Sequence, residues 1–149
     1  MGGIDEEVEI GEPKDDTKVV SFEEAKPKRR PFAYWKIRDR VIQLKLKASF
    51  IERVEAKYGN TNIIDLVFAS DGLPALGVML TVIQAAAMPW NHGLSYTDVQ
   101  NLYDTWCEDG GNQTELFKDI VMPLMAVSGF FSPKQTEEIL ARLEEATDL

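Results

Sequence analysis

The feature that most constrains the fold is a long apolar run from Leu73 to Met88, in which Thr81 and Gln84 are the only polar side chains. A helix over these residues would be apolar around nearly its whole circumference, as expected for the central helix of a bundle. Pro74 suits the first turn of such a helix and Pro89 its end. The run is shorter than the roughly 20 residues that span a bilayer. The sequence therefore predicts a buried central helix and no membrane span.

A β-hairpin is predicted ahead of this helix. The segments "FAYWKI" and "RVIQLKL" flank Arg38-Asp39, and in the second segment Ile42, Leu44 and Leu46 alternate with their neighbours. Alternation of this kind is typical of a half-buried strand. Because Arg-Asp is not a favoured two-residue turn, the register is not predicted.

Two short helices should follow the hairpin. Ser49 with Glu52 makes a capping-box pattern at the start of an amphipathic helix, and Gly59 is placed to stop it. The segment "TNIIDLVF" predicts a second helical segment starting near Thr61. Both precede the central helix.

The stretch from Asn91 to Gly111 holds the only histidine and the only cysteine of the chain. Ser95 with Asp98 forms a capping-box pattern, and Leu94 with Val99 has the spacing of a hydrophobic staple. These signals predict a helix that begins after Ser95 and ends at the Gly-Gly pair.

Two more helices are predicted near the carboxyl end. One runs from about Thr114 to Ser128 and is bent at Pro123, which removes a backbone hydrogen bond. The last follows Ser132 as N-cap and carries a narrow apolar stripe. The whole pattern predicts a mainly α-helical protein: a small bundle of about five helices preceded by a short β-hairpin.

Composition divides the chain into three parts. Residues 1–31 carry nine acidic and six basic residues with almost no apolar periodicity, and we predict a flexible acidic arm. Residues 32–131 form the predicted hairpin and helical domain, and residues 132–149 form an amphipathic C-terminal helix. One cysteine excludes an intramolecular disulfide, and a reducing cytoplasm fits best.

Charge is uneven along the chain. Residues 32–58 carry seven basic and three acidic residues, whereas residues 59–149 carry three basic and thirteen acidic ones. An acidic body of this kind repels a phosphate backbone, so nucleic acid is not the expected partner, although the run "KPKRR" leaves a contact with RNA or an acidic protein open.

Catalytic chemistry has little support in the sequence. His92 and Cys107 are fifteen positions apart, and Cys107 falls on the predicted buried stripe, so a thiol–imidazole pair is not expected. Asp104 and Glu108 are candidates for a divalent ion, but "EDGGNQTE" fails the EF-hand spacing. No phosphate-binding loop or nucleophile elbow occurs. The sequence predicts no enzyme, cofactor or metal site.

Large apolar side chains near predicted helix ends are the remaining candidates for function. Burial in the core is the favoured use of each ring, Trp35 included, while a surplus could line a groove for a partner. The apolar stripe of the last helix is too narrow for a deep core helix and is typical of a protein contact. The predicted partner-binding residues are Trp90, Phe130, Phe131, Ile139, Leu140 and Leu143.

Three segments, taken in their order along the chain, resemble one protein family. They are "LKLKASFIERVEAKYGN", then, after the apolar helix, "HGLSYTDVQNLYDTWCEDGG", and finally "VSGFF". In order and spacing they resemble the tail assembly chaperones of long-tailed bacteriophages and prophages of Gram-positive bacteria. The resemblance covers Trp35 to Phe131, about two thirds of the chain. The arm and the last helix lie outside it.

The resemblance implies a function and a location. Such chaperones bind the tape measure protein, a very long helical protein with much apolar surface, keep it soluble and help tail tube subunits assemble around it. They act in the cytoplasm of the infected host and are absent from the mature virion. A frameshifted longer product, common in the family, would reach the tail tube protein. Self-association into a homo-oligomer stays open.

Two other functions compete with the chaperone. One is a small acidic regulatory protein whose surface mimics nucleic acid, and the other is a metal-dependent enzyme that uses Asp104 and Glu108. Salt-sensitive competition with DNA for a basic partner would favour the first, and thermal stabilisation by manganese or calcium would favour the second.

Overall fold

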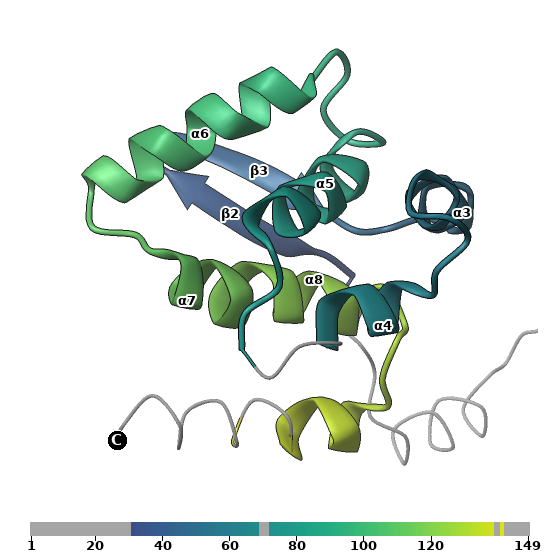
Figure 1. Cartoon of the computed structure of the whole chain (residues 1–149). Coiled ribbons are helices and arrows are strands. Elements are labelled where there is room, and N and C mark those ends of the chain that lie inside the picture. Colours follow the sequence, from purple (N-terminus) through teal and green to yellow (C-terminus); the bar gives the residue numbers. More distant parts are fainter. Residues whose placement is uncertain (1–30, 69–71, 139–140, 142–149) are drawn as a thin grey trace, which may run out of the picture.

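The protein is described from a computed structural model over residues 31–68, 72–138 and 141. Figure 1 shows α6 on one side of a two-stranded hairpin, α5 in front of it, and α7 and α8 on the other side. A mainly helical fold that starts with a hairpin is confirmed. The elements are β2 (Ala33–Ile37), β3 (Arg40–Leu44), α3 (Ala48–Lys57), α4 (Ile63–Phe68), α5 (Leu76–Ala87), α6 (Tyr96–Glu108), α7 (Gln113–Glu115), the π-helix η1 (Leu116–Val121) and α8 (Met122–Val127).

The hairpin is antiparallel with a two-residue loop. Ile37 pairs with Arg40 next to the loop, and Trp35 pairs with Ile42. Arg38 has φ +57°, and it is the one central residue of the loop with a positive φ, as in a type II′ turn. The alternation predicted from the sequence is confirmed, because Ile42, Leu44 and Leu46 are buried while their neighbours are not.

Helix α5 is the centre of the core, as predicted. Eight of its residues are buried, among them Met79, Val82 and Ile83. The predicted position of Pro74 is wrong, because the N-cap is Ala75 and Pro74 lies buried just before it. Pro89 follows the C-cap, as expected. None of the helices in the described part is long and apolar enough to cross a membrane.

The first amphipathic helix forms, but Ser49 does not cap it. Helix α3 starts at Ala48, and its N-cap is Lys47, whose side chain makes no capping bond. The physical reason lies upstream: the Lys45 N–H donates to the Ala86 carbonyl at 3.0 Å, and this tertiary bond fixes where the chain leaves the strand. Gly59, with φ +70°, follows the C-cap as predicted.

Helix α6 has the predicted capping box. The Asp98 N–H donates to Ser95 Oγ at 3.0 Å, and the Ser95 N–H donates to the Asp98 carboxylate at 2.9 Å. Gly110, with φ +108°, lies beyond the C-cap. Cys107 is half-buried rather than buried, because it lies near the end of α6, where the core ends.

Helices α7, η1 and α8 follow one another directly where one bent helix was predicted. The distortion is a π-helical turn that precedes Pro123, whose ring would clash with the Asp119 carbonyl in a regular α-helix. The chain then forms a helix over 133–138, and the Gln135 N–H donates to Ser132 Oγ at 3.0 Å, as the predicted cap requires.

Two predictions fall largely outside the described residues. The acidic arm comprises residues 1–31, of which the structure describes only Pro31. The predicted C-terminal helix is described only over 133–138 and at Ala141.

Candidate partner-binding surface

Trp90 lies in the connection between α5 and α6, and it and Asn91 attach this connection to β3 and to the residue that follows β3. Its indole Nε1–H donates to the Lys45 carbonyl at 3.2 Å, and the Asn91 side-chain amide donates to the Gln43 carbonyl at 3.3 Å. The Trp90 ring meets Phe32 edge to face, with ring centroids 4.9 Å apart. Both rings are half-buried, so part of this pair stays at the surface.

Two lysines cover these rings. Lys47 Nζ lies 5.5 Å from the centroid of Trp90, and Lys45 Nζ lies 5.7 Å from that of Phe32. Such contacts hold an ammonium group over the negative face of a ring. The open end of the hairpin therefore presents cations at fixed positions on an aromatic base.

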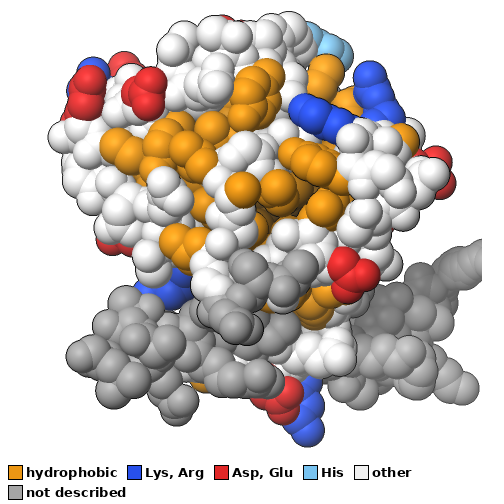
Figure 2. All heavy atoms as spheres, in the orientation of Figure 1, with side chains coloured by type: hydrophobic (Ala, Val, Ile, Leu, Met, Phe, Trp, Pro, Cys, Tyr) orange, Lys and Arg blue, Asp and Glu red, His pale blue; other side chains and the backbone are white. Residues whose placement is uncertain are grey.

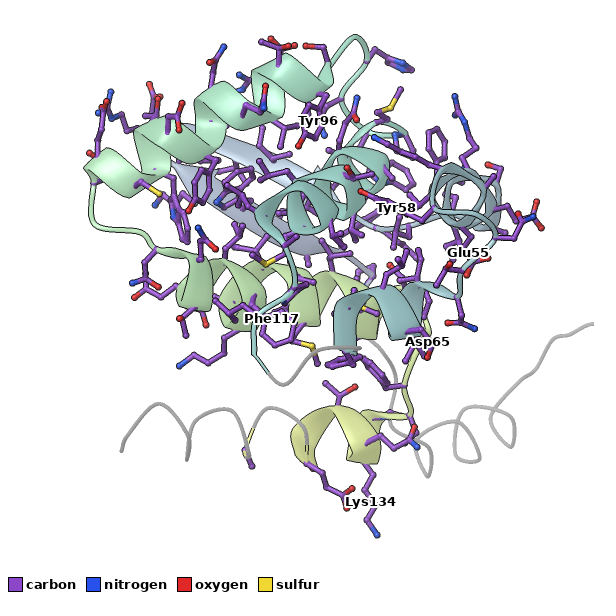
Figure 3. All side chains as sticks on the ribbon, viewed as in Figure 1. Glu55, Tyr58, Asp65, Tyr96, Phe117 and Lys134 are labelled. Carbon is purple, nitrogen blue, oxygen red and sulfur yellow. The ribbon has the colours of Figure 1, made fainter. Side chains whose placement is uncertain are left out.

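The same arrangement continues along α3. Arg53 Cζ lies 4.6 Å from the centroid of Phe50, and Lys57 Nζ lies 5.9 Å from Tyr58 and 5.6 Å from Tyr96. Figure 3 shows Tyr58 between α3 and α5 and Tyr96 between α5 and α6. Lys57 therefore connects the end of α3 to the start of α6.

We call this set the basic–aromatic surface. Every cation–π pair among the described residues belongs to it, and each uses a basic residue from 45–57. Its members are Phe32, Lys45, Lys47, Phe50, Arg53, Lys57, Tyr58, Trp90 and Tyr96.

Of the six predicted partner-binding residues, only Trp90 belongs to this surface. Phe130 is half-buried, and its N–H donates to the Met125 carbonyl at 3.3 Å. Phe131 is 8% exposed and contacts Phe68, with ring centroids 6.1 Å apart. Figure 1 places the segment after α8 far from the α5–α6 connection. Ile139, Leu140 and Leu143 lie outside the described residues.

Sequence reasoning missed the other members of the surface. The excess of basic residues in 32–58 was the available signal, but its partners Trp90 and Tyr96 come from beyond residue 58. Contacts between segments far apart in the chain bring Trp90 to Lys47 and Tyr96 to Lys57.

The catalytic candidates His92 and Cys107 lie on different elements. His92 is exposed in the α5–α6 connection, and Cys107 contacts Tyr103 on α6. Burial raises the pKa of Tyr103 to about 12. The described residues contain no group of three or more His, Cys, Asp or Glu side chains placed to hold a metal ion.

Glu108, one of the two candidate metal ligands, has another partner. Arg38 Nη2 lies 3.3 Å from the Glu108 carboxylate, and Arg38 Nε lies 3.0 Å from that of Asp109. The hydrogen bond to Asp109 is the main cause that raises the pKa of Arg38 above its usual value. These ion pairs join the hairpin turn to the end of α6.

The fold and the surface define a small, mainly helical domain built on a β-hairpin, with cations held over half-buried rings at one end. The chain belongs to the family described as a family of unknown function (DUF6096), which matches residues 33–147. Comparisons with curated proteins and with solved structures found no match.

Proposed function

We propose that this protein is a phage tail assembly chaperone that binds the tape measure protein, keeps it soluble and assists assembly of the tail tube. The observation that carries the proposal is a partly exposed apolar face on a strongly acidic chain. Figure 2 shows hydrophobic side chains gathered on the face over α5 and between the helices around it. The net charge of -9 would keep such a protein dispersed while its apolar side chains bind a client.

The apolar side chains that can contribute are those packed against the core without being buried. Patches of this kind on a protein surface mark sites of protein contact. They are Phe50, Ile51, Tyr58, Ile64, Leu66, Leu76, Tyr96, Tyr103, Trp106, Val127 and Phe130.

The three segments that carry the family resemblance also contact one another. The Leu46 N–H, in the first segment, donates to Ser128 Oγ in the third at 2.8 Å. Lys57, in the first segment, lies over the ring of Tyr96 in the second. The resemblance therefore concerns one connected part of the molecule, which supports treating it as a unit.

The decisive experiment is co-expression with a tape measure protein encoded downstream, followed by size-exclusion chromatography with light scattering. We expect co-elution in a fixed stoichiometry, with the client insoluble when it is expressed alone. If the client stays insoluble and this protein elutes by itself, the proposal is wrong, and a small regulatory binding protein becomes the working hypothesis.

Variants then locate the client-binding residues. We expect Phe130→Ala and Leu143→Ala to reduce client recovery without loss of helical circular dichroism. Val41→Ala is the control, because Val41 is 53% exposed on the hairpin and lies outside the apolar face. Unfolding of the Phe130 or Leu143 variants, with no selective loss of client, would identify these as core residues.

A further inference from the structure

We infer that the basic–aromatic surface binds an acidic segment of a partner protein, one that carries carboxylates beside apolar side chains. The inference goes beyond the proposed function, because it concerns the chemistry of the bound segment whichever protein supplies it. It rests on where the charges lie, on the cations that lie over the aromatic rings, and on the length of the surface.

Charge separates this surface from the rest of the molecule. Residues 45–57 carry four basic and two acidic residues, whereas the other described residues carry five basic and ten acidic ones. One of the two acids is already engaged, since the Glu55 carboxylate accepts a hydrogen bond from the Ile63 N–H at 3.1 Å, on the side of α3 that faces α4 (Figure 3). An acidic segment is therefore attracted here and repelled elsewhere, which fixes where it binds.

The rings favour a peptide over a nucleic acid. A single strand binds by stacking its bases on open aromatic faces. Here a cation already lies over each of the five rings, at centroid distances of 4.6 to 5.9 Å. What remains accessible is the ammonium or guanidinium group and the edge of the ring, and these groups suit a carboxylate and an apolar side chain.

The shape of the surface sets the size of the bound segment. Trp90 contacts Lys47 at the start of α3, and Tyr96 contacts Lys57 at its end. A helix of ten residues is about 15 Å long. Lys47, Arg53 and Lys57 are thus spread over the length of α3, which matches about ten residues of a bound helix. Figure 2 shows Lys and Arg side chains beside hydrophobic ones at this end of the molecule.

The test uses three fluorescently labelled synthetic peptides of about 16 residues, with the same Leu and Phe positions at helical spacing. The remaining positions are Glu, Gln or Lys. We expect the full-length protein at low salt to bind the Glu peptide at least about tenfold more tightly than the Gln peptide. The acidic remainder of the chain attracts the Lys peptide, so binding of the Lys peptide should not depend on Lys47 or Lys57. The affinity for the Glu peptide should fall as salt is added, because these charges are exposed.

A matched pair of variants tests the location. Lys47→Gln with Lys57→Gln should weaken Glu-peptide binding about three- to tenfold. The control, Lys118→Gln with Lys134→Gln, removes the same charge elsewhere and should change binding less than about twofold; Figure 3 shows Lys134 at the far end of the molecule. Circular dichroism and thermal melts check that all four substitutions preserve the fold.

Several outcomes would overturn the inference. One is that the Glu peptide does not bind, or binds no more tightly than the Gln peptide. A second is that the Lys47→Gln with Lys57→Gln variant and the Lys118→Gln with Lys134→Gln variant lose the same affinity for the Glu peptide. A third is that an oligothymidylate binds more tightly than the Glu peptide. The proposed function fails separately, if the tape measure protein is not made soluble. Because the binding test uses synthetic peptides and no tape measure protein, the two tests can fail independently of each other.

Discussion

The β-hairpin carries one edge-to-face aromatic pair at the middle of β2 and another at its open end, but only the pair nearer the turn includes a fully buried ring. Toward the turn, Trp35 is 0% exposed and lies with its centroid 6.0 Å from that of Trp106. At the open end, Phe32 and Trp90 lie 4.9 Å apart, and both are half-buried. Similar rings thus pack the core at one end and remain accessible at the other.

The charges around the two pairs differ in the same way. Near the turn, Arg38 is paired with carboxylates of the same chain at 3.0 and 3.3 Å. At the open end, Lys45 and Lys47 lie over rings and have no ion pair with a carboxylate among the described residues. The charge of Arg38 at the turn is thus neutralised within the chain, whereas Lys45 and Lys47, which have no carboxylate partner in the described part of the chain, can attract a carboxylate from a partner.

The largest expected effect is at the turn end. In Gly111→Ala the new Cβ would overlap the Trp106 ring, and overpacking of this kind should lower the free energy of unfolding by about 2 kcal/mol. Urea denaturation followed by circular dichroism measures it. Gly77→Ala is the control, because a Cβ there has only Tyr96 Oη nearby, at 3.8 Å, and should be neutral or stabilising. If Gly111→Ala and Gly77→Ala change the free energy of unfolding equally, the Trp106 ring can move away from the new Cβ at little cost.

The open end has its own structural bond, and breaking it should cost somewhat less. Ser128 Oγ accepts a hydrogen bond from the Leu46 N–H at 2.8 Å and donates one to the Leu124 carbonyl at 2.6 Å. Ser128→Ala leaves the Leu46 N–H without its acceptor and should lower the free energy of unfolding by about 1 to 2 kcal/mol. Ser128→Thr keeps a hydroxyl and should lose less. An alanine variant as stable as the wild type would show that water replaces the bond.

How much the sequence predicts depends on whether a signal is local. The cap at Ser95, the stop at Gly59 and the buried face of α5 follow from residues within a few positions of one another, and these predictions are confirmed. The cap at Ser49 is wrong because the Lys45–Ala86 hydrogen bond fixes the start of α3 from a distance.

The candidate surface shows the same limit. Trp90 was predicted from its ring alone, but nothing local connects it to Lys47, forty-three positions earlier. The contacts of the turn residue Arg38 are equally hard to predict, because its partners Glu108 and Asp109 follow seventy or more positions later. Contacts between segments this far apart in the chain leave no periodic pattern to find.

A smaller effect tests the ion pairs at the turn. Arg38 and Asp109 have side chains 56% and 46% exposed, so solvent screens their attraction. A double-mutant cycle with Arg38→Gln and Asp109→Asn should give only a small coupling energy, which added salt reduces further. Arg38→Gly should cost less than Arg38→Gln, since glycine adopts the positive φ at this position without strain. A large coupling energy that added salt leaves unchanged would contradict the view that these exposed charges add little to stability.

The smallest expected effect is a pH dependence at the start of α6, beside the open end. The hydrogen bond from the Ser95 backbone N–H is the main cause that lowers the pKa of Asp98 below its ordinary value of 3.8. A carboxylate with a lowered pKa stabilises the folded state at pH values above 3.8, and that stabilisation is lost as the pH falls through the pKa of the folded state. The melting temperature should therefore drop less steeply below pH 4 in Asp98→Asn than in the wild type. Glu115→Gln, at the first turn of α7, provides a carboxylate control that should retain the steeper drop. If Asp98→Asn follows the wild-type curve, acid unfolding is governed by other carboxylates, and the capping box contributes the same stability whether Asp98 is charged or neutral.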